Sequence, residues 1–336
     1  MNDSSEFRPE RRRVLGALSA LAGLSATSWL PASHAETASD WPSKPIRIIV
    51  PYAAGQGADV LTRLIADHIG PILKQPIVVE NRAGAGGNIG TAAAARATAD
   101  GYTFLLGTNA THAANEFLYP NPGYHPDDFT AVAMIGLLPM VICSASPDLP
   151  ANGIAKLLER ARNSPDKLNV GLPSTTAQVI FSEFVHRTSA PLFPIRYKAS
   201  SQSLTDLIGG QIPLVIDTVT ATRPHILAGK LNALAITSRQ ASPMLPGVMP
   251  VSAQGVEGFD IVAWDAFFAP REAPKLSVER FSAALALAMA DPRLEQRMRD
   301  IGVEPLFMSP SITSNFVADE RGKWGGIIRK AGISLS

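Results

Sequence analysis

A repeated order of short apolar strands and amphipathic helices constrains the fold of this chain more than any other feature. Residues 46–50 (Ile-Arg-Ile-Ile-Val) are rich in β-branched side chains and are typical of a buried strand. Apolar residues then recur at helical spacing over 60–69. Further strands are predicted at 76–80 and 102–107, with an Ala-rich helix at 91–97 between them. Such alternation builds a mostly parallel sheet with helices on both faces, so we expect an α/β fold.

A glycine-bearing loop, residues 51–59, joins the first predicted strand to the first predicted helix. The N-terminus of a helix presents unpaired backbone N–H groups, which attract anions. The loop holds no Lys or Arg, so a carboxylate there would be held by backbone amides and the helix dipole. An ordinary strand-to-helix turn explains the same residues equally well. If the loop binds a ligand, the candidate residues are Tyr52, Ala54, Gly55, Gln56, Gly57, Ala58 and Asp59.

The second half of the chain repeats this arrangement. A helix is predicted at 154–162 and a strand at 168–171, and an amphipathic helix follows the loop 172–178. Hydroxyl side chains before a helix are common N-caps, and capping alone would explain them here. Hydroxyls and free amides at a helix N-terminus could also form a second cradle for a carboxylate. The candidate residues are Ser174, Thr175 and Thr176.

Polar residues end two further strands. Thr108 and Asn109 follow strand 102–107 and stand at the carboxyl end of a parallel strand, where open α/β sheets bind their ligands. Asp217 and Thr218 end another apolar strand. Asp217 could accept a hydrogen bond from an amine or hydroxyl of a ligand, or it could cap the helix that follows. The sequence favours neither use.

A long apolar stretch at 131–145 indicates one extended strand, interrupted by Pro139, that crosses into a second domain. Strand 262–270 is expected to return to the first domain, and helical patterns at 278–301 and 317–331 are expected to pack on it. The predicted division is a first lobe of residues 41–138 plus 264–336 and a second lobe of residues 139–263, with hinges near Pro139 and Val262.

The first 35 residues have the pattern of an export signal. Arg11–Arg13 precede a moderately apolar run over 14–30, and Ser33 and Ala35 stand at −3 and −1 of a cleavage point. The adjacent arginines fit a twin-arginine signal, and a general secretory signal fits nearly as well. The run is too short and too polar to anchor the chain across a hydrocarbon core of about 30 Å. We therefore predict cleavage near Ala35 and a soluble mature protein in the periplasm.

Charge and cysteine content exclude several classes of protein. The 336 residues include 30 Lys plus Arg and 29 Asp plus Glu. The first 35 residues hold four basic and three acidic residues, which leaves 26 of each sign in the rest. That balance argues against a nucleic-acid partner, which needs a clustered basic surface. The one cysteine, Cys143, cannot form an intramolecular disulfide, and its apolar neighbours indicate packing in the core.

No motif for catalysis, a cofactor or a metal stands out. Ser174 is not in a G-x-S-x-G motif and the histidines stand in no recognisable catalytic motif, so a periplasmic hydrolase is the weaker alternative. The glycines of 84–90 miss the dinucleotide fingerprint, because Ile89 occupies the place of its third glycine. Metal-ligand spacings such as H-x-x-x-H or C-x-x-C are lacking. We predict no catalytic residue, no cofactor and no metal.

The chain resembles the Bug-type extracytoplasmic solute receptors that serve tripartite tricarboxylate transporters. The similar segments run in order through almost the whole predicted mature chain. They are residues 41–47, 51–59, 79–82, 84–90, 100–102, 197–198, 204–217, 229–231, 233–238, 258–259, Trp264, 323–325 and 331–333.

This resemblance implies a type II periplasmic-binding-protein fold, with two α/β lobes, mostly parallel central sheets and a ligand cleft between them. It implies a small carboxylate (a di- or tricarboxylate, an acidic amino acid or an aromatic acid) held by backbone amides and water. It adds Tyr197 to the candidate binding residues. It also implies a monomer that delivers its ligand to the permease subunits of a tripartite tricarboxylate transporter. A receptor that signals to another membrane partner is an alternative that the sequence does not separate from transport.

Several positions depart from the pattern of that family. The first loop has fewer Pro, Gly and Thr residues than is usual, and the second loop carries two Thr residues in place of a Gly-Ser pair. These changes keep a backbone cradle but leave the ligand's identity open. The departing residues are Ala53, Gln56 and Ala58 in the first loop, Thr175, Thr176 and Val179 near the second, and Ala199 after the Tyr-Lys pair.

Overall fold

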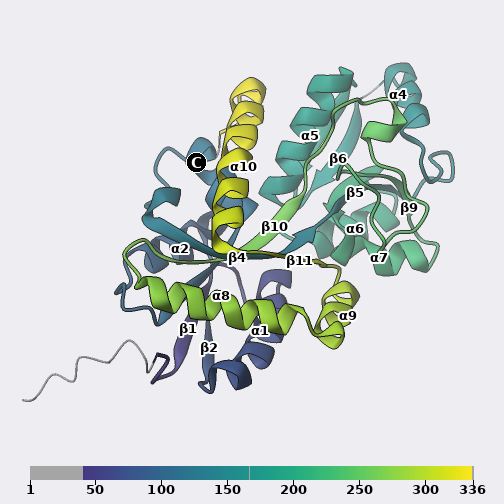
Figure 1. The fold of residues 1–336 in the computed structure, drawn as a ribbon. Helices are drawn as coiled ribbons and strands as arrows, with labels where there is room; N and C mark the ends of the chain where they lie inside the picture. The colour runs from purple at the N-terminus through teal and green to yellow at the C-terminus, as the bar shows by residue number, and fades with distance from the viewer. Residues whose placement is uncertain (1–40, 166, 335–336) are drawn as a thin grey trace, which may run out of the picture. The chain divides into compact units, whose positions relative to one another are not determined.

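The structure, a computed structural model, describes residues 41–165 and 167–334. These residues form two mixed sheets, each flanked by helices (Figure 1). The predicted export signal, with Arg11–Arg13 and the cleavage point near Ala35, lies outside the described residues. Within the described ranges, no helix combines the length and the hydropathy that crossing a bilayer requires.

A six-stranded sheet combines strands from the two ends of the described chain. The strands lie in the order β11-β4-β10-β3-β1-β2. β1 pairs in parallel with β2 and with β3, which confirms the alternation predicted from the sequence. β10 is antiparallel to β3 and β4, and β11 is antiparallel to β4, so the sheet is mixed and not mostly parallel as expected. The strands are β1 (Ile46–Val50), β2 (Ile77–Asn81), β3 (Thr103–Thr108), β4 (Phe129–Leu138), β10 (Ala263–Pro270) and β11 (Glu304–Met308).

Helices cover both faces of this sheet. α1, α8 and α9 bury their apolar sides on one face, where the rings of Phe104 and Phe281 stack 3.9 Å apart. α2, α3 and α10 cover the other face, where the indole N–H groups of Trp264 and Trp324 donate to Glu320 at 3.2 and 2.9 Å. The helices are α1 (Gly57–Leu73), α2 (Asn88–Ala95), α3 (Asn115–Leu118), α8 (Lys275–Met289), α9 (Pro292–Asp300) and α10 (Pro310–Ala331).

A five-stranded sheet contains the middle of the chain, in the order β7-β6-β8-β5-β9. β6 is parallel to β7 and β8, whereas β5 is antiparallel to β8 and β9. Cys143 is fully buried in this sheet as a free thiol whose pKa is raised by burial, as expected for a core residue. The strands are β5 (Met140–Ser144), β6 (Leu168–Leu172), β7 (Leu192–Arg196), β8 (Leu214–Thr218) and β9 (Asn232–Ile236). Its helices are α4 (Ile154–Asn163), α5 (Thr175–Thr188), α6 (Ser200–Ile208) and α7 (Val219–Leu227).

The apolar stretch 131–145 is divided between the two sheets. β4 ends at Leu138 in the first sheet and β5 begins at Met140 in the second. The expected interruption at Pro139 and the crossing are therefore present, but the stretch forms two strands and not one. Pro139 has no N–H to continue a ladder, and its carbonyl accepts a hydrogen bond from the Val219 amide at 2.9 Å. One residue therefore separates the strands that connect the two sheets.

Gly90 explains why the glycine-rich segment after β2 is so tightly packed. A Cβ atom at Gly90 would lie 2.6 Å from the Arg82 carbonyl oxygen and 2.7 Å from the Cα atom of Pro51. Both neighbours are backbone atoms that cannot rotate away. These glycines miss the dinucleotide fingerprint, and the contact at Gly90 gives one of them a packing role, because a residue without a Cβ atom lets the chain segments approach closely.

We expect Gly90→Ala to destabilise the protein by about 1–3 kcal/mol, because the backbone at Pro51 would have to move. Equilibrium unfolding in urea measures the change in the free energy of unfolding. Gly322→Ala is the matched control, because a Cβ atom at Gly322 in α10 meets nothing within 4 Å. Equal midpoints for Gly90→Ala and the parent would contradict the packing argument.

Candidate functional site

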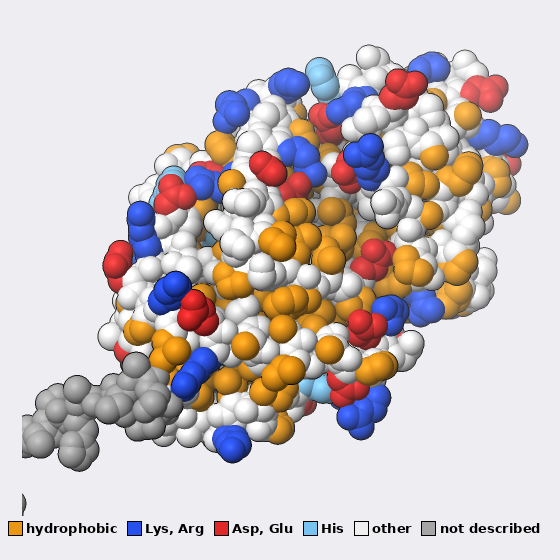
Figure 2. Space-filling view, in the orientation of Figure 1, with side chains coloured by type: hydrophobic (Ala, Val, Ile, Leu, Met, Phe, Trp, Pro, Cys, Tyr) orange, Lys and Arg blue, Asp and Glu red, His pale blue; other side chains and the backbone are white. Residues whose placement is uncertain are grey.

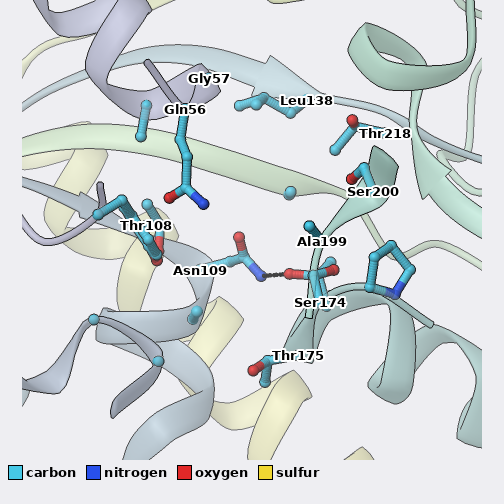
Figure 3. Close-up of a pocket in the computed structure, with 18 of the residues that line it drawn as sticks. Gln56, Gly57, Thr108, Asn109, Leu138, Ser174, Thr175, Ala199, Ser200 and Thr218 are labelled. Carbon is cyan, nitrogen blue, oxygen red and sulfur yellow. Dashed lines mark hydrogen bonds between the residues drawn. The ribbon is translucent and has the colours of Figure 1, made fainter. Parts of the chain in front are cut away.

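A cavity of about 830 Å³ is lined by elements that belong to both sheets. Figure 3 shows its labelled side chains, with Gln56 and Thr108 on one side and Ser174, Ala199 and Ser200 on the other. The carboxyl ends of β3 and β8 and the N-termini of α1 and α5 converge on it. Residues predicted from the sequence that line it are Tyr52, Gln56, Gly57, Ala58, Thr108, Asn109, Ser174, Thr175, Thr176, Asp217 and Thr218.

The first wall contains the N-terminus of α1. Gln56 precedes the helix, and its side chain accepts a hydrogen bond from the Ala53 amide at 3.2 Å instead of capping the first turn. Within the described chain, the amides of Gly57 and Ala58 donate to no protein acceptor. Both residues line the cavity. Two free N–H groups at the positive end of a 17-residue helix therefore border the cavity.

Asp59 holds this loop in place through hydrogen bonds. Its Oδ2 accepts from the Gly55 amide at 2.8 Å, and its Oδ1 lies 2.9 Å from both Arg63 and the Asn81 amide nitrogen. Burial alone would raise the pKa of Asp59, but these hydrogen bonds and the Arg63 charge hold it below its usual value. Asp59 is 2% exposed and is not among the residues that line the cavity.

The residues at the end of strand β3 form hydrogen bonds within the first wall and across to the second wall. The Thr108 hydroxyl and the Tyr52 hydroxyl are 2.8 Å apart. The Asn109 amide donates to the Thr176 hydroxyl at 2.9 Å, drawn as the dashed line in Figure 3. Since Asn109 follows the six-stranded sheet and Thr176 begins α5 on the five-stranded sheet, this hydrogen bond joins the two halves of the cavity wall.

The second wall contains the N-terminus of α5. The Ser174 hydroxyl accepts a hydrogen bond from the Ala177 amide at 3.1 Å, so Ser174 is the N-cap of α5. Capping was one of the two interpretations of this loop. The amides of Thr175 and Thr176 donate to no acceptor within the described residues. Capping and a free pair of amides therefore occur at the same helix end.

Asp217 does not cap the helix that follows it. Thr218 does so, because its hydroxyl accepts from the Ala221 amide at 3.2 Å. One Asp217 oxygen accepts from the Thr218 amide at 2.7 Å, and the other is buried without a partner among the described residues. Burial raises the pKa of Asp217 to about 6. This leaves one acceptor on the cavity wall.

Four predicted residues do not line the cavity: Ala54, Gly55, Asp59 and Tyr197. The Tyr197 hydroxyl donates to Asp206 at 2.7 Å, and burial together with this bond raises its pKa to about 12. Sequence reasoning missed other lining residues, among them Gln178, Lys198, Ser200 and Asp265. Asp265 had a visible signal, since it is the one charged residue in the apolar strand β10.

Two sheets with helices on both faces and a cavity between strand ends and helix N-termini define a two-lobed α/β solute-binding fold. Residues 61–333 match the sequence model of the family described as "Tripartite tricarboxylate transporter family receptor". The chain belongs to this family, which confirms the resemblance seen in its sequence.

Individual relatives agree with this assignment. Protein BugT of Bordetella pertussis is 33% identical over 326 residues, which cover 96% of this chain and 97% of BugT. An R. palustris protein solved with adipate is 32% identical, has a TM-score of 0.79, and matches 88% of this chain and 99% of its own. MatC of Rhodopseudomonas palustris, solved with bound malate, is 26% identical with a TM-score of 0.75, over 86% of this chain and 100% of its own.

Proposed function

We propose that this protein captures a small carboxylate between its two lobes and delivers it to the membrane permease of a tripartite tricarboxylate transporter. The observation that carries the proposal is the pair of helix N-termini, α1 and α5, whose unpaired amides border one cavity. Family membership and the adipate and malate found in two relatives support the same class of ligand.

The strength of such a cradle suits a transport receptor. Binding with micromolar affinity corresponds to about 8 kcal/mol. Hydrogen bonds to a charged group contribute about 1.5–3 kcal/mol each. Four to six amides from the two loops therefore supply about 6–18 kcal/mol, from which the entropy of association is subtracted. Ligand capture needs no chemical step. The Ser174 hydroxyl is engaged as a cap, and no histidine is among the described residues that line the cavity.

The lobe boundaries follow the sheets in this proposal. One lobe would consist of residues 41–138 and 264–336, and the other of residues 139–263. At Pro139 the chain passes from β4 in the first sheet to β5 in the second, and it returns to the first sheet with β10, which begins at Ala263. These two connections would be the hinges when the lobes close on a ligand. The protein would act as a monomer without cofactor or metal. In the part of the chain that is described, no cluster of His, Cys, Asp and Glu suits a metal ion.

The face drawn in Figure 2 lacks the clustered basic charge of a nucleic-acid surface. On the face drawn in Figure 2, Lys and Arg side chains are interspersed with Asp and Glu side chains. A nucleic-acid surface would show basic side chains gathered together. We assign the membrane permease as the macromolecular partner. A sensor protein co-purifying in place of a permease would instead indicate a signalling receptor.

A thermal-shift screen of the protein starting at Glu36 tests the proposed function. The panel holds mono-, di- and tricarboxylates, amino acids, aromatic acids, neutral sugars and cationic amines. We expect carboxylates alone to stabilise the protein, by about 3 kcal/mol at a concentration 100 times the Kd. Stabilisation by a sugar or an amine without a carboxylate would contradict the proposal, since helix N-termini favour negative charge.

Export through the twin-arginine route is proposed from residues outside the described part of the chain. Replacing Arg11–Arg13 together with Lys is expected to leave precursor in the cytoplasm, because that route requires the adjacent arginines. Fractionation and immunoblotting of periplasm and cytoplasm measure the result, with the unaltered precursor as control. Normal export of the variant would instead assign the general secretory route.

A further inference from the structure

Asp265 is a buried carboxylate without a partner on the wall of the cavity. It lies in β10, opposite Thr108 of β3 and Gly136 of β4. Only 3% of its surface is exposed, and its Oδ2 has no hydrogen-bond partner among the described residues. None of the ion pairs in the described chain includes Asp265, although it lines the cavity. A buried carboxylate left unpaired in this way costs free energy. We therefore expect a bound ligand to supply the hydrogen-bond donor that Asp265 lacks.

Asp265 lies on the same wall of the cavity as the N-terminus of α1. Its register neighbour Thr108 is hydrogen-bonded to Tyr52, and Tyr52 belongs to the loop that leads into α1. The free acceptor and the free amides of Gly57 and Ala58 therefore belong to the same wall of the cavity. Of the ionisable residues that line the cavity, Tyr52 and Asp265 are the two that belong to this wall.

We propose that Asp265 accepts a hydrogen bond from a positively charged amino group of the ligand, so that this receptor takes an amino acid in preference to the same acid without its amine. The inference rests on the proposed function and narrows its ligand class. An ammonium group supplies both the missing donor and the missing counter-charge, whereas a hydroxyl supplies only the donor.

The rest of the wall favours the same ligand. Asp217, on β8 of the other sheet, is 2% exposed and lines the same cavity, and one of its oxygens has no hydrogen-bond partner among the described residues. Lys198 is the only Lys or Arg among the described residues that line the cavity. Two buried acids repel a ligand that carries only carboxylates, and they attract one that carries an amine. Burial raises the pKa of Asp265 to about 7, which reflects the absence of a protein counter-charge.

Matched pairs of acids that differ only in the amino group test the inference. The pairs are aspartate with succinate, glutamate with glutarate, 2-aminoadipate with adipate, and leucine with 4-methylpentanoate, each titrated by calorimetry at pH 7. We expect the amino member of the best-fitting pair to bind about tenfold or more tightly, as one hydrogen bond between charged groups requires. In Asp265→Asn the two members should bind within about threefold of each other.

Asp319→Asn is the control, because it removes one negative charge at an exposed position of α10. It should keep the preference of the parent. Equal or tighter binding of the plain acid by the parent would overturn the inference, and so would a preference that survives in Asp265→Asn. If no pair binds while the screen finds another carboxylate, the inference fails and the proposed function stands. If no carboxylate in the screen binds, the proposed function itself fails, so the two failures are distinguishable.

Proton exchange gives a second measurement that needs no variant. An ammonium group beside Asp265 favours its ionised form, so binding of the amino acid to the parent should release protons. A plain diacid that occupied the same place would favour the protonated form and take up protons. Titrations in phosphate and in Tris, whose ionisation enthalpies differ, give the sign. Proton uptake on binding of the amino acid would overturn the inference.

Discussion

Replacing Asp265 with Asn is expected to stabilise the ligand-free protein at pH 8 by up to about 4 kcal/mol. Burial raises the pKa of Asp265 from 3.8 to about 7. Each pKa unit corresponds to about 1.4 kcal/mol, so the ionised form is disfavoured in the folded protein by about that total. Asn has nearly the shape of the protonated acid and carries no charge. It therefore removes the cost of a buried, unpaired carboxylate.

The upward direction of the pKa shift determines the pH range over which Asp265 lowers the stability of the folded protein. The folded protein holds the Asp265 proton more tightly than the unfolded chain. The protonated Asp265 therefore makes its full contribution to the free energy of unfolding below about pH 4. It is lost as the pH rises through about 7. Asp217 adds a smaller loss through about pH 6 for the same reason. The parent should lose stability from pH 4 to pH 8, and Asp265→Asn should lose much less.

Urea unfolding of both proteins at intervals from pH 4 to pH 8 measures this difference. Asp319→Asn is again the control, because its exposed side chain should leave the slope unchanged. Curves for the parent and for Asp265→Asn that stay parallel over the whole range would show that Asp265 ionises without cost. That outcome would require a counter-charge beside Asp265 that residues 41–165 and 167–334 do not supply.

Gly57→Val is expected to weaken carboxylate binding about 100-fold or more while the fold is retained. A Cβ atom at Gly57 meets nothing within 4 Å, and the residue lines the cavity at the first turn of α1. The added side chain would occupy the space in front of the free amides. Loss of two hydrogen bonds to a charged group, at about 1.5–3 kcal/mol each, accounts for the size of the effect.

Neighbouring substitutions separate crowding from other causes. Gly322→Val adds the same side chain on α10, where a Cβ atom meets nothing within 4 Å, and it should bind like the parent. Gln56→Ala removes only a side chain and should weaken binding by about a factor of ten at most. Gly55 has a φ of +79° and does not line the cavity, so Gly55→Val should act by straining the loop.

Calorimetric titration of each variant with the best acid from the screen measures these effects. Far-UV circular dichroism and thermal unfolding establish that each variant is folded. A folded Gly57→Val protein that binds the acid like the parent would show that the amides of α1 do not hold the carboxylate.

The sequence predicted those parts of the fold that local patterns determine. The β-branched run at 46–50, the helical spacing after it and the turn residues at 51–59 are all contained within a few residues of one another, and the corresponding strand and helix are present. β11 was not expected, because Glu304–Met308 contains a proline and shows no alternation of apolar and polar residues. Its place at the edge of the first sheet depends on pairing with β4, which lies more than 160 residues earlier.

The site was predicted in part for the same reason. Loops next to strands, such as those holding Gln56 and Ser174, could be recognised from neighbouring residues. Asp265 could not be assigned to the cavity, because its position depends on β10 lying between β3 and β4 in the sheet. Gly55 and Asp59 were placed with the site because they are close to it in sequence, yet they do not line the cavity, and the hydrogen bond between them holds the loop.

A crystal structure of the protein with the best acid from the screen is the most direct measurement of ligand capture between the two lobes. We expect a carboxylate of the ligand in the cavity, with its oxygens about 2.7–3.1 Å from the amide nitrogens of Gly57, Ala58, Thr175 or Thr176, or joined to them by one water. A ligand bound outside the cavity, or bound inside it with its carboxylate held by side chains alone, would contradict the proposal that two helix N-termini form the cradle.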